Sequence, residues 1–93
     1  MEQTVLKNFW SYNSDLCNIQ IPIVKNLEEV FKGRVIFESI SAEENKEMVS
    51  KYNIKEFPTI IIECDGQERE RFVGLTQELF LKRALKKILS ERK

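Results

Sequence analysis

The sequence contains no histidine, and this absence removes several kinds of catalytic site at once. Ser-His-Asp triads, Cys-His nucleophile pairs and most zinc sites depend on an imidazole ring. Only two cysteines occur, Cys17 and Cys64, so the chain has no disulfide framework. We therefore expect no metal ion or other cofactor, and free thiols unless one of them does chemistry.

Long apolar runs and an excess of charge of one sign are also missing. No segment approaches the roughly 20 apolar residues needed to span a bilayer, and the N-terminus has no signal-peptide pattern. Fifteen basic residues balance fifteen acidic ones, which argues against a nucleic-acid-binding protein. We expect one domain, residues 1–93, that is monomeric and cytoplasmic, with neither nucleic acid nor a membrane as its partner.

What the chain does have is a regular alternation of predicted strands and helices. Apolar and β-branched runs predict strands over residues 4–10, 35–40, 59–63 and 67–73. Helices are predicted over residues 16–31, after Ser41 and after Thr76. Strand, helix, strand implies a parallel pair, and Asp65-Gly66 predicts a hairpin. The expected fold is α/β, with a four-stranded mixed sheet in the order 2-1-3-4 flanked by three helices.

Local signals predict how the helices begin and which side they bury. Ser41 followed by Glu44 fits a capping box, and Thr76 is predicted to cap the last helix. Asn53 is suited to the left-handed conformation that closes the short helix. In the first helix the apolar positions at helical spacing are Leu16, Ile19, Ile23, Leu27, Val30 and Phe31.

The junction between the first strand and the first helix is the best candidate for chemistry. Cys17 falls in the first helical turn, where the helix dipole and free backbone N–H groups favour the thiolate form. Cys17 is equally well explained as a small buried apolar residue. Ser14, just before an acidic residue, has the pattern of a helix N-cap, and no histidine is available to activate it as a nucleophile.

Several anchors in the correct order resemble the thioredoxin family across residues 5–89. They are Phe9-Trp10, an x-x-Cys at the helix start, Pro22 within that helix, Tyr52-x-Ile54, Phe57-Pro58-Thr59, Asp65-Gly66 and Val73-Gly74. The resemblance implies that the bond before Pro58 is cis. It also implies a groove near the thiol, formed by Trp10, Asn13, Phe57, Pro58, Val73 and Gly74, that holds extended polypeptide.

The departures from this family concern the reactive residues themselves. In the family a Cys-x-x-Cys pair reduces disulfides, because one thiolate attacks and the other resolves the mixed disulfide. Here Ser14 stands at the attacking position, and Cys17 is the resolving or sole thiol. The buried aspartate of the family falls at Asn8, and Asp15 places a negative charge beside Cys17.

Cys64 does not replace the missing thiol. It lies six residues beyond Pro58 along a strand, about 20 Å away at roughly 3.3 Å per residue, whereas a disulfide needs Cα atoms within about 7 Å. We expect Cys64 to be an exposed thiol at the edge of a turn. The sequence leaves open whether Ser14 is native or replaces a cysteine or selenocysteine.

The sequence therefore leads to two functional hypotheses. In the first, the chain is a thioredoxin-like thiol–disulfide redox protein with a degenerate active site. It is a protein-disulfide oxidoreductase if Ser14 replaces a native cysteine or selenocysteine, and otherwise monothiol or inactive. Its partners would be protein or small-molecule disulfides and thiols, with a thioredoxin-reductase-type electron donor. In the second, the domain is a redox-inactive module that holds an extended peptide or partner at the groove around Pro58.

Overall fold

The computed structural model describes residues 3–91 and contains seven elements. In chain order they are β1 (Thr4–Trp10), α1 (Asp15–Val30), β2 (Ile36–Ser41), α2 (Lys46–Lys51), β3 (Thr59–Cys64), β4 (Gln67–Val73) and α3 (Glu78–Glu91). Within residues 3–91 no helix combines the length and apolar character needed to cross a membrane.

The four strands form one mixed sheet in the order β2-β1-β3-β4. The central strand β1 pairs in parallel with β2 and antiparallel with β3, and β3 pairs antiparallel with β4. This confirms the predicted strand order and the mixed sheet with three helices. The parallel pair follows from the helical crossover through α1, and the antiparallel pairing of β3 with β4 follows from the tight turn between them.

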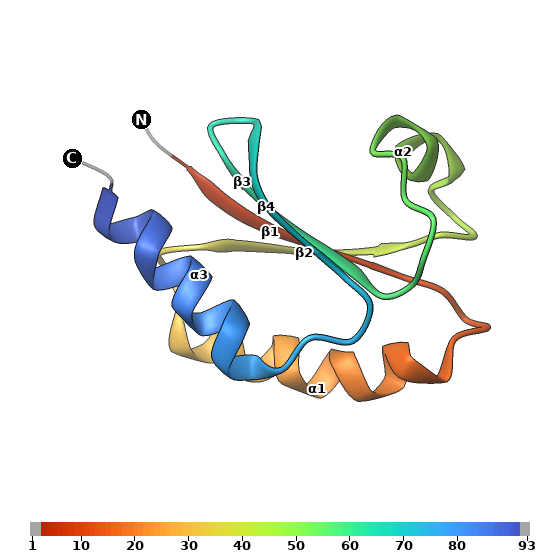
Figure 1. The fold of residues 1–93 in the computed structure, drawn as a ribbon, viewed down its shortest axis with the longest axis horizontal. Helices are drawn as coiled ribbons and strands as arrows, with labels where there is room; N and C mark the ends of the chain where they lie inside the picture. Colours follow the sequence, from red (N-terminus) through yellow and green to blue (C-terminus); the bar gives the residue numbers. More distant parts are fainter. Residues whose placement is uncertain (1–2, 92–93) are drawn as a thin grey trace.

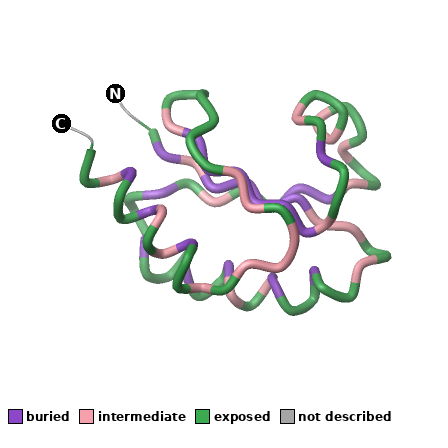
Figure 2. Tube along the Cα trace, viewed as in Figure 1, coloured by how far each residue is buried: buried purple, intermediate pink, exposed green. Residues whose placement is uncertain are grey.

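The helices cover the two faces of the sheet unequally (Figure 1). Both α1 and α3 pack on one face, and the short α2 lies on the other. Alternation along β1 supplies both cores, since Leu6 belongs to the α1–α3 side and Phe9 to the α2 side. Figure 2 shows the buried residues concentrated along the strands and on the sides of α1 and α3 that face them.

The turn between β3 and β4 has the geometry that its sequence predicts. Asp65 and Gly66 both have positive φ, 54° and 82°, as a two-residue hairpin turn requires. Asn53, with φ 55°, closes the turn after α2 as expected. β3 ends one residue later than predicted, at Cys64.

The buried side of α1 agrees with the predicted one only in part: Leu27 and Phe31 are completely buried and Ile23 packs against the core. Leu16, Ile19 and Val30 are 45%, 52% and 46% exposed, whereas Gln20 is completely buried. Gln20 is buried because its amide bonds to the backbone before α3: Nε2 donates to Thr76 O at 3.0 Å, and Thr76 N–H donates to Oε1 at 2.8 Å. The helix runs from Asp15 to Val30 rather than from 16 to 31.

Two predicted helix caps act in other ways. Thr76 does not cap α3, because the helix begins at Glu78 and its first amide bonds go to Gln77 O. Ser41 does accept the Glu44 N–H, at 3.3 Å, but the residues that follow form a turn and α2 begins only at Lys46. The Ser41 pattern therefore organises the turn that leads into the helix.

A polar network covers the part of the sheet that lies beside α2. Tyr52 Oη donates to Glu63 Oε2 at 2.6 Å, and the Lys7 amine lies 3.7 Å from Glu63 Oε1. Lys7 and Glu63 are only 8% and 5% exposed. Arg71 Nη2 donates to Tyr52 O at 2.9 Å, so strand β4 also holds the end of α2. These contacts satisfy charged groups that would otherwise be costly to bury.

Candidate functional site

The candidate site is formed where β1 ends and α1 begins. Ser14 is the N-cap residue, with extended backbone angles of φ −113° and ψ 115°, and the helix starts at Asp15. The cap is made by the backbone alone: Cys17 N–H donates to Ser14 O at 3.2 Å, and the Ser14 side chain makes no cap bond. The Ser14 hydroxyl is therefore directed to another part of the site.

Ser14 connects the helix start to the loop before β3. Its Oγ donates a hydrogen bond to Phe57 O at 3.0 Å. The next peptide bond, between Phe57 and Pro58, is cis. Pro58 O in turn accepts the Gly74 N–H at 2.8 Å. A continuous set of bonds thus joins position 14, the Phe57-Pro58 loop and the end of β4.

Cys17 lies behind this surface, in the first turn of α1. Its side chain is 1% exposed, and the Ser11 N–H donates to Sγ at 3.5 Å. This backbone donor pairs with a sulfur that would otherwise be buried without a polar partner. The burial separates the sulfur from solvent, so position 14 is the more accessible end of the motif.

The remaining predicted groove residues divide into two groups. Val73 is 54% exposed and pairs with Thr59, which directly follows Pro58. Trp10 and Asn13 instead lie on the other side of the site, Trp10 as the last residue of β1 and Asn13 in the loop that precedes α1. Trp10 Nε1 donates to Ser39 Oγ at 2.8 Å, and Asn13 N–H donates to Ser11 Oγ at 3.2 Å.

Glu43 positions this loop, and sequence reasoning did not identify it. Its carboxylate accepts the Ser11 hydroxyl at 2.6 Å and the Tyr12 N–H at 3.4 Å. The Ser11 hydrogen bond holds the pKa of Glu43 below its usual range. No local signal marks this role, because 32 residues separate Glu43 from Ser11. Only the pairing of β1 with β2 brings them together.

The two cysteines are free thiols. Cys64 is half-buried at the end of β3 and packs against the core on the α1–α3 side. The expectation of an exposed thiol at the edge of the turn was therefore wrong. The hydrophobic core on the α1–α3 side covers part of a side chain whose position in the sequence, next to Asp65-Gly66, indicates exposure.

Comparisons with known proteins, by sequence and by structure, both find thioredoxins. The family model described as thioredoxin matches residues 1–87. A thioredoxin of Synechocystis sp. is 30% identical over 88 residues, which are 95% of this chain and 82% of that protein. A thioredoxin of Rickettsia bellii is 30% identical over 74 residues, covering 80% of this chain and 70% of the relative.

Solved structures show the same architecture. The X-ray structure of Fasciola hepatica thioredoxin aligns with a TM-score of 0.84 and 25% identity, over 91% of this chain and 80% of that one. A malaria parasite thioredoxin-2, described as a component of the protein secretion machinery, aligns with a TM-score of 0.88 and 19% identity. That alignment covers 92% of this chain and 84% of the other.

Proposed function

This chain belongs to the thioredoxin family, and from that premise we propose that it is a thiol–disulfide redox protein whose altered active site keeps one thiol, Cys17. A thioredoxin-like redox function is what the relatives support. Our proposal adds the roles: position 14 is the attacking position, occupied here by serine, and Cys17 is the resolving or sole thiol.

One observation carries the assignment of these roles. The Ser14 hydroxyl donates to the carbonyl of Phe57 at 3.0 Å and Ser14 is partly exposed, while Cys17 is buried with a backbone N–H on its sulfur. An attacking group needs access to a bound disulfide, and a resolving group needs only to reach the first sulfur. Ser14 is partly exposed, which suits the attacking position, and Cys17 is buried, which suits the resolving position.

The chemistry that the arrangement allows depends on the atom at position 14. With sulfur there, its thiolate would attack a substrate disulfide and expel one substrate thiolate. Cys17 would then attack the mixed disulfide, release the second substrate thiol and leave a disulfide between positions 14 and 17. Two electrons pass from the protein dithiol to the substrate. Serine cannot form the first bond.

The Ser14→Cys variant tests this proposal. We expect it to form a disulfide between positions 14 and 17 and to reduce insulin in the presence of dithiothreitol, at a rate above that of the unaltered chain. The matched control is Ser50→Cys, which adds a thiol at an exposed position of α2. A Ser14→Cys protein that folds but forms no such disulfide would contradict the assigned roles.

The reactivity of Cys17 can be tested with serine kept at position 14. In a Cys64→Ser background we expect glutathione disulfide to form a mixed disulfide with Cys17 and to release one glutathione thiolate. Because Cys17 is 1% exposed, the reaction should be much slower in the folded than in the urea-unfolded protein. Mass spectrometry of timed samples measures both rates, and Cys17→Ser in the same background gives the blank.

A second candidate function is a redox-inactive module that holds an extended partner at the same surface. The contrast between the buried sulfur of Cys17 and the 54% exposed side chain of Val73 favours it. No glutathione adduct in the folded state, with normal adduct formation in urea, would reject the monothiol reaction. The binding module would then be the better description of the unaltered chain.

A further inference from the structure

The loop that joins β1 to α1, residues 11–14, lies against the sulfur of Cys17. The Ser11 N–H donates to Sγ at 3.5 Å, and Cys17 is only 1% exposed. A disulfide must approach the sulfur directly in order to react with it, so part of the surrounding chain has to move first. Tyr12 and Asn13 are exposed, and a segment with few buried contacts opens at low cost.

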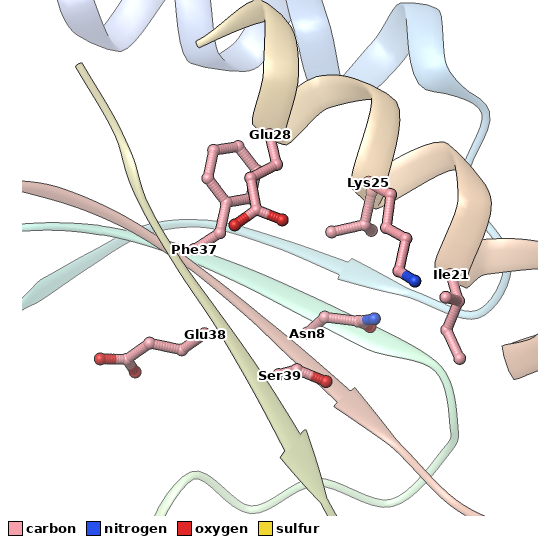
Figure 3. A pocket seen from close by; sticks show the side chains of 8 residues that line it. Asn8, Ile21, Lys25, Glu28, Phe37, Glu38 and Ser39 are labelled. Atoms are coloured by element: carbon pink, nitrogen blue, oxygen red, sulfur yellow. The ribbon is translucent and has the colours of Figure 1, made fainter. Parts of the chain in front are cut away.

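The cavity between α1 and the strands β1 and β2 does not open onto this sulfur. Figure 3 shows Asn8 and Ser39 on the strand side of the cavity and Lys25 and Glu28 on the helix side. Cys17 is not among the residues that line it. We therefore expect a reactant to reach the sulfur past the loop rather than through this cavity.

Ser11 holds the loop together, because each of its polar groups is hydrogen-bonded. Its N–H donates to Cys17 Sγ at 3.5 Å, and its carbonyl oxygen accepts the Ser14 N–H at 3.3 Å. Its hydroxyl accepts the Asn13 N–H at 3.2 Å and donates to Glu43 Oε2 at 2.6 Å. Of these bonds, the one to Glu43 ties the loop to a distant part of the chain.

Glu43 is well placed to be this anchor. It follows β2 by two residues, and the pairing of Trp10 with Ser41 fixes the end of β2 beside the start of the loop. The Glu43 carboxylate also accepts the Tyr12 N–H, at 3.4 Å, so it holds two consecutive residues of the loop. The Ser11 bond lowers the pKa of Glu43, so both bonds are charge-assisted at neutral pH.

We propose that Glu43 is a positioning residue for the reaction of Cys17: through Ser11 it holds the loop closed against the sulfur and so controls how often a disulfide reaches it. This inference deepens the proposed redox function and rests on it, since the reaction controlled is the attack of Cys17 on a small disulfide such as glutathione disulfide. In that step Sγ bonds to one sulfur of the disulfide, and the other sulfur leaves as a thiolate. A weaker anchor increases the population of the open loop.

Iodoacetamide measures access to Cys17 independently of disulfide exchange. In a Cys64→Ser background, Cys17 Sγ displaces iodide and forms a thioether, which mass spectrometry follows with time. We expect Glu43→Ala to raise the rate in the folded protein about three- to tenfold, as the loss of a partly screened hydrogen bond to a charged group allows. The rates in urea-unfolded protein should be equal.

Two further variants separate the hydrogen bond from the charge. Glu47→Ala removes an exposed carboxylate whose side chain makes no hydrogen bond or ion pair within residues 3–91, and it should leave the rate unchanged. Glu43→Gln removes the charge but keeps an acceptor for Ser11, so its rate should lie closer to that of the parent than to that of Glu43→Ala. Equal rates in Glu43→Gln and Glu43→Ala would show an effect of charge alone and overturn the positioning role.

A double variant tests whether Glu43 acts through Ser11. Ser11→Ala removes the same hydrogen bond from its other end and should also accelerate the reaction. Because the two changes share one bond, the double variant should react more slowly than the product of the two single effects predicts. Effects that multiply fully would show that Glu43 does not act through Ser11.

The dependence of the rate on urea distinguishes movement of the loop from unfolding of the whole molecule. Opening of the loop exposes little surface, so the alkylation rate should change little with urea below the unfolding transition. A rate that rises with the full slope of global unfolding, or equal rates in the parent and Glu43→Ala, would overturn the proposal even if glutathione disulfide still modifies Cys17. Faster alkylation of Glu43→Ala without any glutathione adduct would support the control of access and reject the monothiol reaction.

Discussion

Two side chains at the site make hydrogen bonds that their residue type and sequence position do not predict. Ser14 has the sequence of a helix cap, yet its hydroxyl bonds across to Phe57 O, 43 residues away. Glu43, which looks like one of several surface acids, holds Ser11 and Tyr12 in the loop before α1. In both cases a hydrogen bond between distant segments determines the role, and residue type alone does not predict it.

Tyr52 gives a prediction at the scale of one side chain. Tyr52→Phe removes the donor to the nearly buried Glu63, and we expect the free energy of unfolding to fall by about 1–3 kcal/mol at neutral pH, the usual cost of an unpaired buried group. Urea unfolding measures the loss. Tyr12→Phe, at a side chain that is 64% exposed, is the control and should change little.

The same contact predicts a dependence on alkaline pH. The hydrogen bond to Glu63 raises the pKa of Tyr52 to about 12, from a usual value of about 10. A group whose pKa is raised on folding contributes its full stability below its unfolded pKa and loses it as pH rises through the folded one. The stability difference between the unaltered chain and Tyr52→Phe should therefore shrink between about pH 10 and 12. A difference that stays constant over that range would contradict the contact.

At the scale of elements, the strands were predictable and the helices less so. Alternating apolar residues and the Asp65-Gly66 turn depend on neighbours in sequence, and the predicted β1 and β4 match the observed ones. The buried side of α1 depends on Gln20, whose partner Thr76 lies 56 residues away. Residue periodicity contains no information about such a partner. The burial of Gln20 therefore could not be predicted from the apolar pattern of the helix.

A variant of Gln20 tests how much this connection between α1 and the segment before α3 stabilises the fold. Its amide joins the middle of α1 to the segment that leads into α3 through two hydrogen bonds with Thr76. Gln20→Ala should lower the free energy of unfolding by about 2–4 kcal/mol, since it leaves a backbone donor and acceptor unpaired and opens a void. Thermal or urea unfolding reports the change. Gln77→Ala, at an exposed residue just before α3, should have an effect below about 0.5 kcal/mol.

The candidate site shows the same division between what the sequence predicts and what it does not. The positions of Ser14, Cys17 and Pro58 could be predicted because they lie at fixed spacing from recognisable anchors. The cavity at Asn8 could not be predicted, because it is the space left between α1 and two strands after their side chains pack. The burial of Cys17 likewise follows from packing and not from spacing.

At the scale of the whole molecule, the hydrophobic cores on the two sides of the sheet differ in size. Among residues 3–91, the hydrophobic core on the side with α1 and α3 contains ten buried residues, including Leu27, Phe31 and Leu85. The other side contains four, and none belongs to α2, whose residues are at most half-buried. Local opening follows the number of buried apolar contacts, so α2 is expected to open without the rest of the molecule.

Amide hydrogen exchange measures this difference. The N–H groups within α2 should exchange at least tenfold faster than the interior N–H groups of α1 and α3, as expected if local opening costs at least about 1.4 kcal/mol less there. Met48→Ala, which removes a contact between α2 and the sheet, should raise exchange in α2 and leave α3 unchanged. Equal protection across the three helices would show that the molecule opens as one unit.

The place of β1 also has a consequence during synthesis. This strand lies at the centre of the sheet, yet it precedes both of its partners in the chain. A ribosome therefore releases β1, with Leu6, Phe9 and Trp10, before β2 exists and well before β3 at residues 59–64. Until Cys64 has emerged, the edge of β1 that pairs with β3 remains without its partner. The apolar residues of the sheet's future centre are therefore exposed during synthesis, which is the condition under which chains aggregate unless they are protected.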